Sequence, residues 1–157
     1  MNSESLLAQF EALLPLAAAW ATEQEQAILR DGVSLSPEEI ADARAIEIQE
    51  PDRVRLLRVE VIARPSQPQL KAACEAIDFL TPAMRGLTLG HGIFIRCDCW
   101  RDRLLIVHEL VHVAQYEKMG GILPFLRRYL YECLTLGYSA SHLEQEAIAV
   151  TARVCGG

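Results

Sequence analysis

Five consecutive residues, His108-Glu109-Leu110-Val111-His112, combine side chains that bind a metal ion with one that can move a proton. Two histidines four positions apart on a helix differ by only about 40° around its axis, so both imidazoles can reach one ion. Glu109 lies about 100° further round, where its carboxylate can take a proton from an activated water molecule and pass it to a leaving group. The residues immediately on both sides of the motif are apolar, which predicts a buried helix and a dry site.

A third metal ligand has to come from another part of the chain. The pattern of the metzincins, one class of zinc peptidases, would place glycine at position 115 and histidine at position 118, but the chain has Gln115 and Lys118. A later predicted helix offers two glutamates instead, Glu144 and Glu146. Because residues two apart on a helix point in nearly opposite directions, only one of them can be the ligand.

Together, the HExxH motif and the segment Glu144-Gln145-Glu146-Ala147-Ile148 resemble the gluzincin clan of zinc metallopeptidases, whose third ligand opens a Glu-x-x-x-Asp pattern. The compact order of a β-hairpin, the HExxH helix, a connecting helix and the glutamate helix, over residues 87–154, is similar to the minigluzincins. This resemblance implies that the ion is Zn²⁺ and that Glu144 is its third ligand, with Glu146 as the alternative. The chain departs from the pattern at Ile148, where the clan often has an aspartate that hydrogen-bonds a zinc-bound histidine.

The resemblance also implies how a substrate would lie. In that clan the strand before the HExxH helix is a sheet edge that holds an extended peptide by β-augmentation, a role that falls here on part of residues 90–96. A peptidase also needs a group that stabilises the oxyanion formed at the cleaved bond. Tyr129, Tyr131, Tyr138 and His142 all lie between the two ligand helices; Tyr138 and His142 are nearest the start of the second one and are therefore the candidates.

These features lead first to a zinc-dependent metallopeptidase that hydrolyses a peptide or protein substrate, with Glu109 as general base and then general acid. An alternative is a catalytically silent, zinc-binding interaction module with a degenerate peptidase fold, which Ile148 favours and the intact Glu109 opposes. A third interpretation is a DNA-associated metalloprotease that recruits His142 as a third histidine ligand. The acidic charge of the chain and the absence of a basic patch speak against it.

The elements that must position these residues follow from hydrophobic periodicity, helix caps and helix breakers. Pro15 is expected to kink the first helix or split it in two. The predicted class is α+β, mostly helical, with a small antiparallel or mixed sheet of about three strands packed on the motif helix. The chain is predicted to form a single domain over residues 1–157, with 1–50 as an N-terminal helical extension and 51–157 as the zinc-binding core. Helices are predicted over residues 3–30, 37–49, 69–80, 102–118, 123–136 and 141–154, and strands over 54–64, 86–89 and 92–97.

Composition limits the partners and the compartment. The 157 residues are 51% hydrophobic and carry a formal charge of −6, which disfavours nucleic acid and anionic membrane as partners. Five cysteines suit a reducing compartment better than a disulfide framework, and Cys97 and Cys99 lack the further ligands of a zinc knuckle. The apolar run at residues 13–21 has no basic residue before it, so it is predicted to be a helix and not a signal peptide. No segment is expected to span a membrane, and a cytoplasmic protein is therefore expected.

Overall fold

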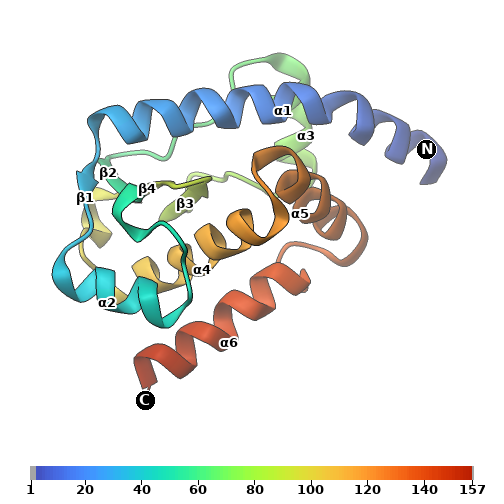
Figure 1. Cartoon of the computed structure of the whole chain (residues 1–157). Helices are drawn as coiled ribbons and strands as arrows, with labels where there is room; N and C mark the ends of the chain where they lie inside the picture. Colours follow the sequence, from blue (N-terminus) through green and yellow to red (C-terminus); the bar gives the residue numbers. More distant parts are fainter. Residues whose placement is uncertain (1–2, 157) are drawn as a thin grey trace.

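A mixed four-stranded sheet lies in the middle of the fold, and helices cover both of its faces (Figure 1). The computed structural model describes residues 3–156. The strands are β1 (Val33–Ser34), β2 (Arg55–Val59), β3 (Gly86–Leu89) and β4 (Gly92–Arg96), in the spatial order β1-β2-β4-β3. β2 and β4 run parallel, and the two outer pairs are antiparallel. The predicted α+β class is confirmed, with the short strand β1 added to the strands expected from the sequence.

Six α-helices account for most of the described residues. The second of them, α2, begins as predicted, because Ser36 and Glu39 form a capping box in which each side chain accepts a hydrogen bond from the other residue's backbone N–H. It ends earlier than predicted, because the backbone turns at Glu47, whose φ is 73°. The helices are α1 (Ser3–Asp31), α2 (Pro37–Ala45), α3 (Pro68–Ala76), α4 (Arg103–Met119), α5 (Ile122–Leu136) and α6 (His142–Gly156), and two 3₁₀ helices span η1 (Pro51–Arg53) and η2 (Cys97–Cys99).

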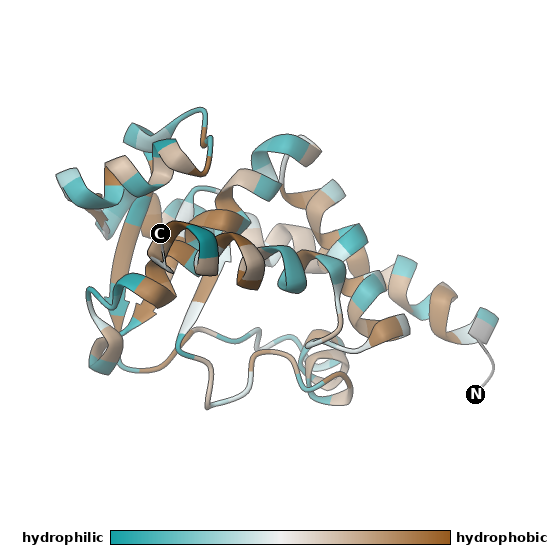
Figure 2. Ribbon diagram, turned by 90° about the horizontal axis from the view of Figure 1, so that it is seen from below, coloured by the Kyte–Doolittle hydropathy of each residue, from teal (hydrophilic) through white to brown (hydrophobic). Residues whose placement is uncertain are grey.

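The sheet is buried on both faces, and each face packs against its own hydrophobic core. Along β4, Ile93 and Ile95 belong to the core that contains α4, whereas Phe94 belongs to the core that contains α1. Side chains alternate between the faces of a strand, so a strand covered on both sides must be apolar throughout. Figure 2 shows hydrophobic residues concentrated in the strands and in α4 at the middle of the molecule. The order of layers is therefore α1, sheet, α4, with α6 packed on α4 (Figure 1).

The N-terminal helix α1 is an integral part of this arrangement. It runs through Pro15 without interruption, so the proline does not split the helix. Leu14, Ala21 and Ile28 are seven residues apart, lie on the same side of the helix and are fully buried. The helix contacts β2, β4 and α5, and β1 continues from it to pair with β2. Packing of this face compensates for the one hydrogen bond that proline cannot donate.

α1 also has the length and composition of a membrane span. Over Glu4–Asp31 its most apolar window reaches a mean hydropathy of 1.2. These two criteria alone do not decide between a span and a core helix, so the expectation that no segment spans a membrane stays a prediction. Core helices of soluble proteins and N-terminal signal sequences meet the same criteria. In this structure the helix lies along one face of the sheet (Figure 1).

The strand that directly precedes the motif helix is not an edge strand. β4 lies between β2 and β3 and pairs with both. The predicted edge role of residues 90–96 is therefore wrong, and the edge of the hairpin nearest to the motif helix is β3. This order arises because β2, which comes earlier in the chain, pairs in parallel with β4; a two-stranded hairpin pattern in the sequence carries no information about that long-range pairing.

Candidate metal centre

The motif helix α4 is held at both ends and buried in the middle. The side chain of Asp102 caps its start by accepting a hydrogen bond from Leu105 N, and Gly120 ends it in a left-handed conformation with a φ of 93°. Its central turns lie between the sheet and α6. The helix therefore presents His108 and His112 to α6 from a rigid, apolar position, as the sequence predicted.

Three side chains converge between α4 and α6. His108 Nε2 lies 2.9 Å from Glu144 Oε1, and His112 Nε2 lies 3.1 Å from Glu144 Oε2. Each of these residues offers one ligand atom, and the three atoms lie within 4.8 Å of one another. Ligands at 2.0–2.1 Å in a tetrahedral zinc site are separated by about 3.3 Å. The three donor atoms are therefore close enough together to hold one metal ion.

Glu144 is positioned by the start of its helix and by a tyrosine. Ser141 Oγ accepts a hydrogen bond from Glu144 N at 3.2 Å, and Glu132 Oε1 accepts one from Leu143 N at 3.1 Å, so the first turn of α6 is fixed. The hydroxyl of Tyr129 donates to Glu144 Oε2 at 2.9 Å. Burial alone would raise the pKa of Glu144, but its hydrogen bonds with the two histidines outweigh burial and hold the pKa well below its usual range. The carboxylate is thus kept ionised, as a metal ligand must be.

Glu109 lies beside this group of ligands, against the edge strand β3. Thr88 Oγ1 lies 3.1 Å from Glu109 Oε2 and 3.0 Å from Glu109 O, so its hydroxyl ties the residue to the strand. A Cβ atom at Gly86 would lie 3.2 Å from Glu109 Cγ, so any larger residue at position 86 would require the Glu109 side chain to shift by a few tenths of an ångström. Burial raises the pKa of Glu109, and the nearby histidines only partly offset that effect. This carboxyl group can therefore take up a proton more readily than an exposed one.

Gln115 is the second partner of His112. Its Oε1 lies 2.8 Å from His112 Nδ1, and its Nε2 donates to Leu143 O and to Glu146 Oε1, both at 3.0 Å. The side chain is 2% exposed, so these hydrogen bonds are shielded from solvent. In the gluzincin pattern an aspartate at position 148 would provide such a partner, but Ile148 is 52% exposed and faces outward. A glutamine three residues after the histidine thus orients the imidazole from the same helix.

The two glutamates that the sequence left open have different roles. Glu144 joins the two histidines, whereas Glu146 binds Gln115 and lies outside the ligand group. The pKa of His112 reflects the same arrangement: burial alone would lower it, but the hydrogen bond with Glu144 and the charge of Glu109 raise the pKa to about 9. The structure therefore groups Glu144, and not Glu146, with the two histidines.

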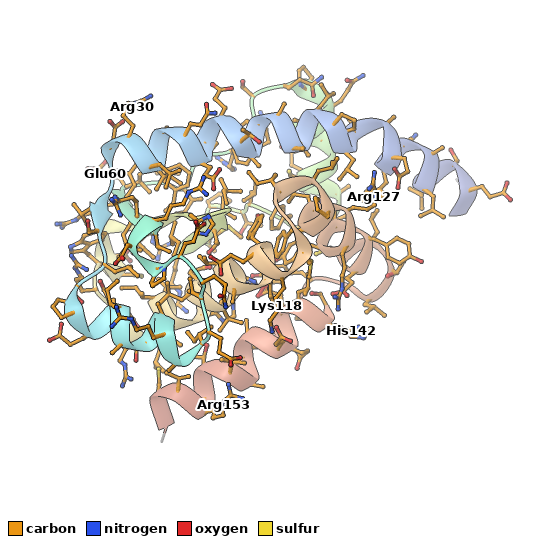
Figure 3. The ribbon with its side chains drawn as sticks, in the orientation of Figure 1. Arg30, Glu60, Lys118, Arg127, His142 and Arg153 are labelled. Carbon is orange, nitrogen blue, oxygen red and sulfur yellow. The ribbon has the colours of Figure 1, made fainter. Side chains whose placement is uncertain are left out.

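His142 does not reach the site. Its side chain is 71% exposed at the outer side of α6, as Figure 3 shows, and its nearest charged partner is Glu132, with Nδ1 and Oε2 3.7 Å apart. The prediction that His142 stabilises an oxyanion is therefore wrong, and it cannot act as a third histidine ligand. The physical reason is its place as the first residue of α6, on the opposite side of the helix from Glu144.

The three tyrosines between the motif helix and α6 lie in different surroundings, which the sequence did not predict. Tyr138 lines the same cavity as Glu109, His112 and Glu144, and burial together with these carboxylates raises its pKa, so its hydroxyl keeps its proton and can donate a hydrogen bond. Tyr129 lies closer still and binds Glu144 directly. Tyr131 is exposed. The signal for Tyr129 was its spacing of four residues from Phe125 and from Cys133, which places it on the buried face of α5.

A second group of possible ligands, Glu50, His91 and Glu117, lies at the tip of the β3–β4 hairpin. Glu117 Oε1 accepts a hydrogen bond from Gln49 N at 2.7 Å, and its Oε2 accepts one from Glu50 N and lies 2.8 Å from His91 Nε2. Burial alone would raise the pKa of Glu117, but these hydrogen bonds lower it. The carboxylate is satisfied without an ion, so this group serves to clamp the hairpin tip to the end of α4.

Comparisons with known protein families, with curated proteins and with solved structures give no match to this chain. The chemical interpretation of the site therefore rests on its own geometry.

Proposed function

We propose that this chain is a metal-dependent peptide hydrolase of the gluzincin type. His108, His112 and Glu144 would hold a Zn²⁺ ion, and Glu109 would be the general base and general acid. The single observation that carries this proposal is the buried carboxylate of Glu109 beside three converging ligand atoms. A structural metal site has no use for such a group, because burying a carboxylate that neither binds the ion nor takes part in a reaction only costs stability.

The donor set fits a catalytic ion better than a structural one. Two imidazoles and one carboxylate are three protein ligands, which leaves the fourth tetrahedral position open, whereas structural zinc sites have four protein ligands. Zn²⁺ bound here would supply Lewis-acid chemistry and lower the pKa of water. Gln115 and Tyr129 support this assignment, because each hydrogen-bonds a proposed ligand and limits its rotation.

Glu109 has the properties of a proton carrier. Its raised pKa brings the carboxyl group closer to neutral pH, where it can both accept and release a proton during one reaction cycle. The Thr88 hydroxyl holds one of its oxygens at 3.1 Å, and the other is directed past Gly86. The proton would be accepted at a carboxylate oxygen of Glu109 and then delivered to the leaving amine. Tyr138, which keeps its proton, would donate a hydrogen bond to the developing oxyanion.

The edge strand β3 is suited to hold an extended peptide. Arg96 N donates to Arg85 O at 2.8 Å, so in this antiparallel pair the backbone groups of the next residue, Gly86, and of Thr88 point away from β4. The Thr88 carbonyl indeed accepts a hydrogen bond from the Tyr116 hydroxyl instead of from β4. The remaining outward groups lie beside Glu109, and they would pair with the backbone of a peptide substrate by β-augmentation.

Metal content and turnover test this proposal together. We expect the purified wild type to bind about one equivalent of Zn²⁺, Glu144→Ala to lose it, and the matched variant Glu146→Ala to keep it. Glu109→Gln should keep the metal and lose about 10²- to 10⁴-fold in kcat/KM on a peptide library. Zinc retained in Glu144→Ala, or equal turnover by wild type and Glu109→Gln, would contradict the proposal.

A catalytically silent zinc-binding module is the second candidate. Among the described residues that line the cavity, none besides His112 can carry a positive charge. An oxyanion would therefore depend mainly on Tyr138 for a hydrogen bond, and this weak stabilisation favours a module that does not catalyse. If wild type binds zinc and a peptide but cleaves no member of the library, this second function replaces the first.

A further inference from the structure

A cavity of about 190 Å³ connects the candidate metal centre with the apolar interior under α1. Glu109, His112 and Glu144 line one part of it. The rest is formed by side chains of α1, α3, β3 and α5 and by the segment that leads from α3 to β3. The cavity is therefore continuous with the group of residues that would carry out hydrolysis, and a substrate bound to that group has direct access to it.

The residues that line the cavity determine which chemical groups it can bind. Beyond Glu109, His112 and Glu144, no charged side chain lines the cavity in the described part of the chain, and its surface is almost entirely apolar. In the part of the cavity away from these three residues, a charged group would lose its hydration and find no charged partner in return. An aliphatic or aromatic group would bury its surface against leucine, isoleucine and phenylalanine side chains and so gain the hydrophobic contribution.

The volume of the cavity further limits which groups can occupy it. An engineered apolar cavity of about 150 Å³ in another protein stays dry and binds benzene. A cavity of about 190 Å³ accordingly holds one aromatic ring or one branched aliphatic side chain. It is smaller than the pockets of about 300–1,000 Å³ that enclose whole drug-sized ligands. The occupant is thus a single side chain of a larger molecule, whose remainder stays outside.

Much of the wall comes from segments outside the motif-bearing part of the chain. Leu13 and Ala17 of α1, Ala73 of α3 and Ile77 directly after α3 line the cavity, together with residues of the strand that carries Gly86. We propose that this cavity is the specificity pocket of the site and takes one large apolar side chain of the peptide substrate, next to the bond that is cleaved. This inference rests on the proposed function. It gives the N-terminal helix a direct part in substrate selection.

Two neighbouring alanines of α3 allow a matched test. Ala73 lines the cavity and is half-buried, whereas Ala72 is exposed and does not line it. Ala73→Phe places a ring in the cavity, and Ala72→Phe adds the same ring to the surface of the same helix. If Ala73→Phe fails to fold, Leu13→Ala provides the opposite change, because it enlarges the cavity and should shift the preference toward larger aromatic side chains.

The first readout is cleavage of peptides that differ only at the two residues flanking the cleaved bond, by the zinc-loaded full-length chain. We expect leucine or phenylalanine at one of these positions to be preferred over glycine and aspartate by at least about 10-fold in kcat/KM. Ala73→Phe should remove this preference, and Ala72→Phe should keep it. Cleavage without a preference for apolar residues, or the same preference in both variants, would overturn the proposal while leaving the hydrolase function intact.

The second readout does not require turnover. Toluene, titrated into the full-length chain, should shift the methyl NMR signals of cavity residues in wild type and Ala72→Phe but not in Ala73→Phe. If no peptide is cleaved and this pattern holds, the hydrolase function fails and the cavity stands as a binding site for an apolar side chain. If toluene shifts none of these signals in wild type, or shifts them equally in Ala73→Phe, the pocket is not what we propose.

Discussion

At the scale of single residues, the geometry of the candidate site depends on neighbours that are neither proposed metal ligands nor the proposed proton carrier. Gln115 is the clearest case, because its buried side chain connects His112 with Glu146 and with the backbone of α6. It provides the orienting hydrogen bond that the departure at Ile148 would otherwise leave missing. Ile148 cannot provide the hydrogen bond that the clan's aspartate provides, and Gln115 of the motif helix provides it instead.

We therefore expect Gln115→Leu, which keeps the volume but removes the hydrogen bond to His112 Nδ1, to weaken zinc binding by about 10- to 100-fold. The dissociation constant can be measured by competition with a chromophoric chelator. Gln145→Leu is the matched control, since the Gln145 side chain is exposed on α6 and, in the described structure, donates a hydrogen bond to Ser139 O and to no ligand residue. Equal zinc affinity in wild type and Gln115→Leu would show that the hydrogen bond does not orient the ligand.

Gly86 is a second neighbour of this kind, because the absence of its side chain affects the position of Glu109. Its added Cβ would lie 3.2 Å from both Glu109 Cγ and Leu105 Cδ1 in a buried place. Gly86→Ala should displace the Glu109 carboxylate and lower kcat by about 10-fold, because a small misplacement of a catalytic group is costly, while zinc content stays at the wild-type level. Gly156→Ala, where nothing lies within 4 Å of the added atom, is the control. An unchanged kcat in Gly86→Ala would indicate that Glu109 can shift freely.

At the scale of elements, the site is assembled by the first turn of α6 against the middle of α4. The backbone N–H groups at the start of α6 are satisfied by Ser141 and Glu132, and that turn carries Glu144. A helix end that is fixed in this way presents its side chains in one orientation. The position of Glu144, the proposed third ligand, therefore depends on the hydrogen bonds that cap the start of α6.

Removal of this cap gives a prediction about stability and metal binding together. Ser141→Ala should lower the free energy of unfolding by about 1–2 kcal/mol, because Glu144 N loses its partner in a buried place, and should also weaken zinc binding. Urea denaturation of the metal-free protein and chelator competition measure the two effects. Ser139→Ala, at an exposed position two residues earlier, should change neither. If both variants behave alike, the cap does not position Glu144.

At the scale of the whole molecule, the packing of charged groups predicts how the metal-free protein responds to pH. The pKa of His112 is raised to about 9, since its hydrogen bond with Glu144 and the charge of Glu109 outweigh burial. A histidine with a raised pKa in the folded state stabilises the fold fully below pH of about 6.5, and this contribution is lost as the pH rises through about 9. The raised pKa of Glu109 acts in the same direction above its ordinary value.

The free energy of unfolding of the metal-free protein should therefore fall by roughly 3 kcal/mol between pH 6 and pH 9.5, as measured by urea denaturation with a chelator present. His112→Gln removes the group and should flatten this dependence. With excess zinc the trend should be opposite, because deprotonated ligands bind the ion more tightly. A metal-free protein that is equally stable at both pH values would contradict the paired arrangement of His112 and Glu144.

Local patterns in the sequence were enough for the helices, for three of the four strands and for the part of the site that lies on α4. Helical periodicity, the Ser36 capping box and the Gly120 stop predicted the helices to within a few residues, and the spacing of His108, Glu109 and His112 predicted which faces of α4 they occupy. These features are short-range, since a helix places residues three and four apart on the same face whatever the rest of the chain does.

The contacts between elements could be determined only from the tertiary structure. The choice of Glu144 over Glu146, the partners Gln115 and Tyr129, the edge position of β3 and the outward turn of His142 all depend on how α6, α5 and β2 dock against α4 and β4. The cavity walled by α1 and α3 is of the same kind, because it joins segments far apart in sequence. The sequence by itself determined the chemistry available on each element; packing determined which of those groups meet, because contacts between distant segments leave no local periodicity to read.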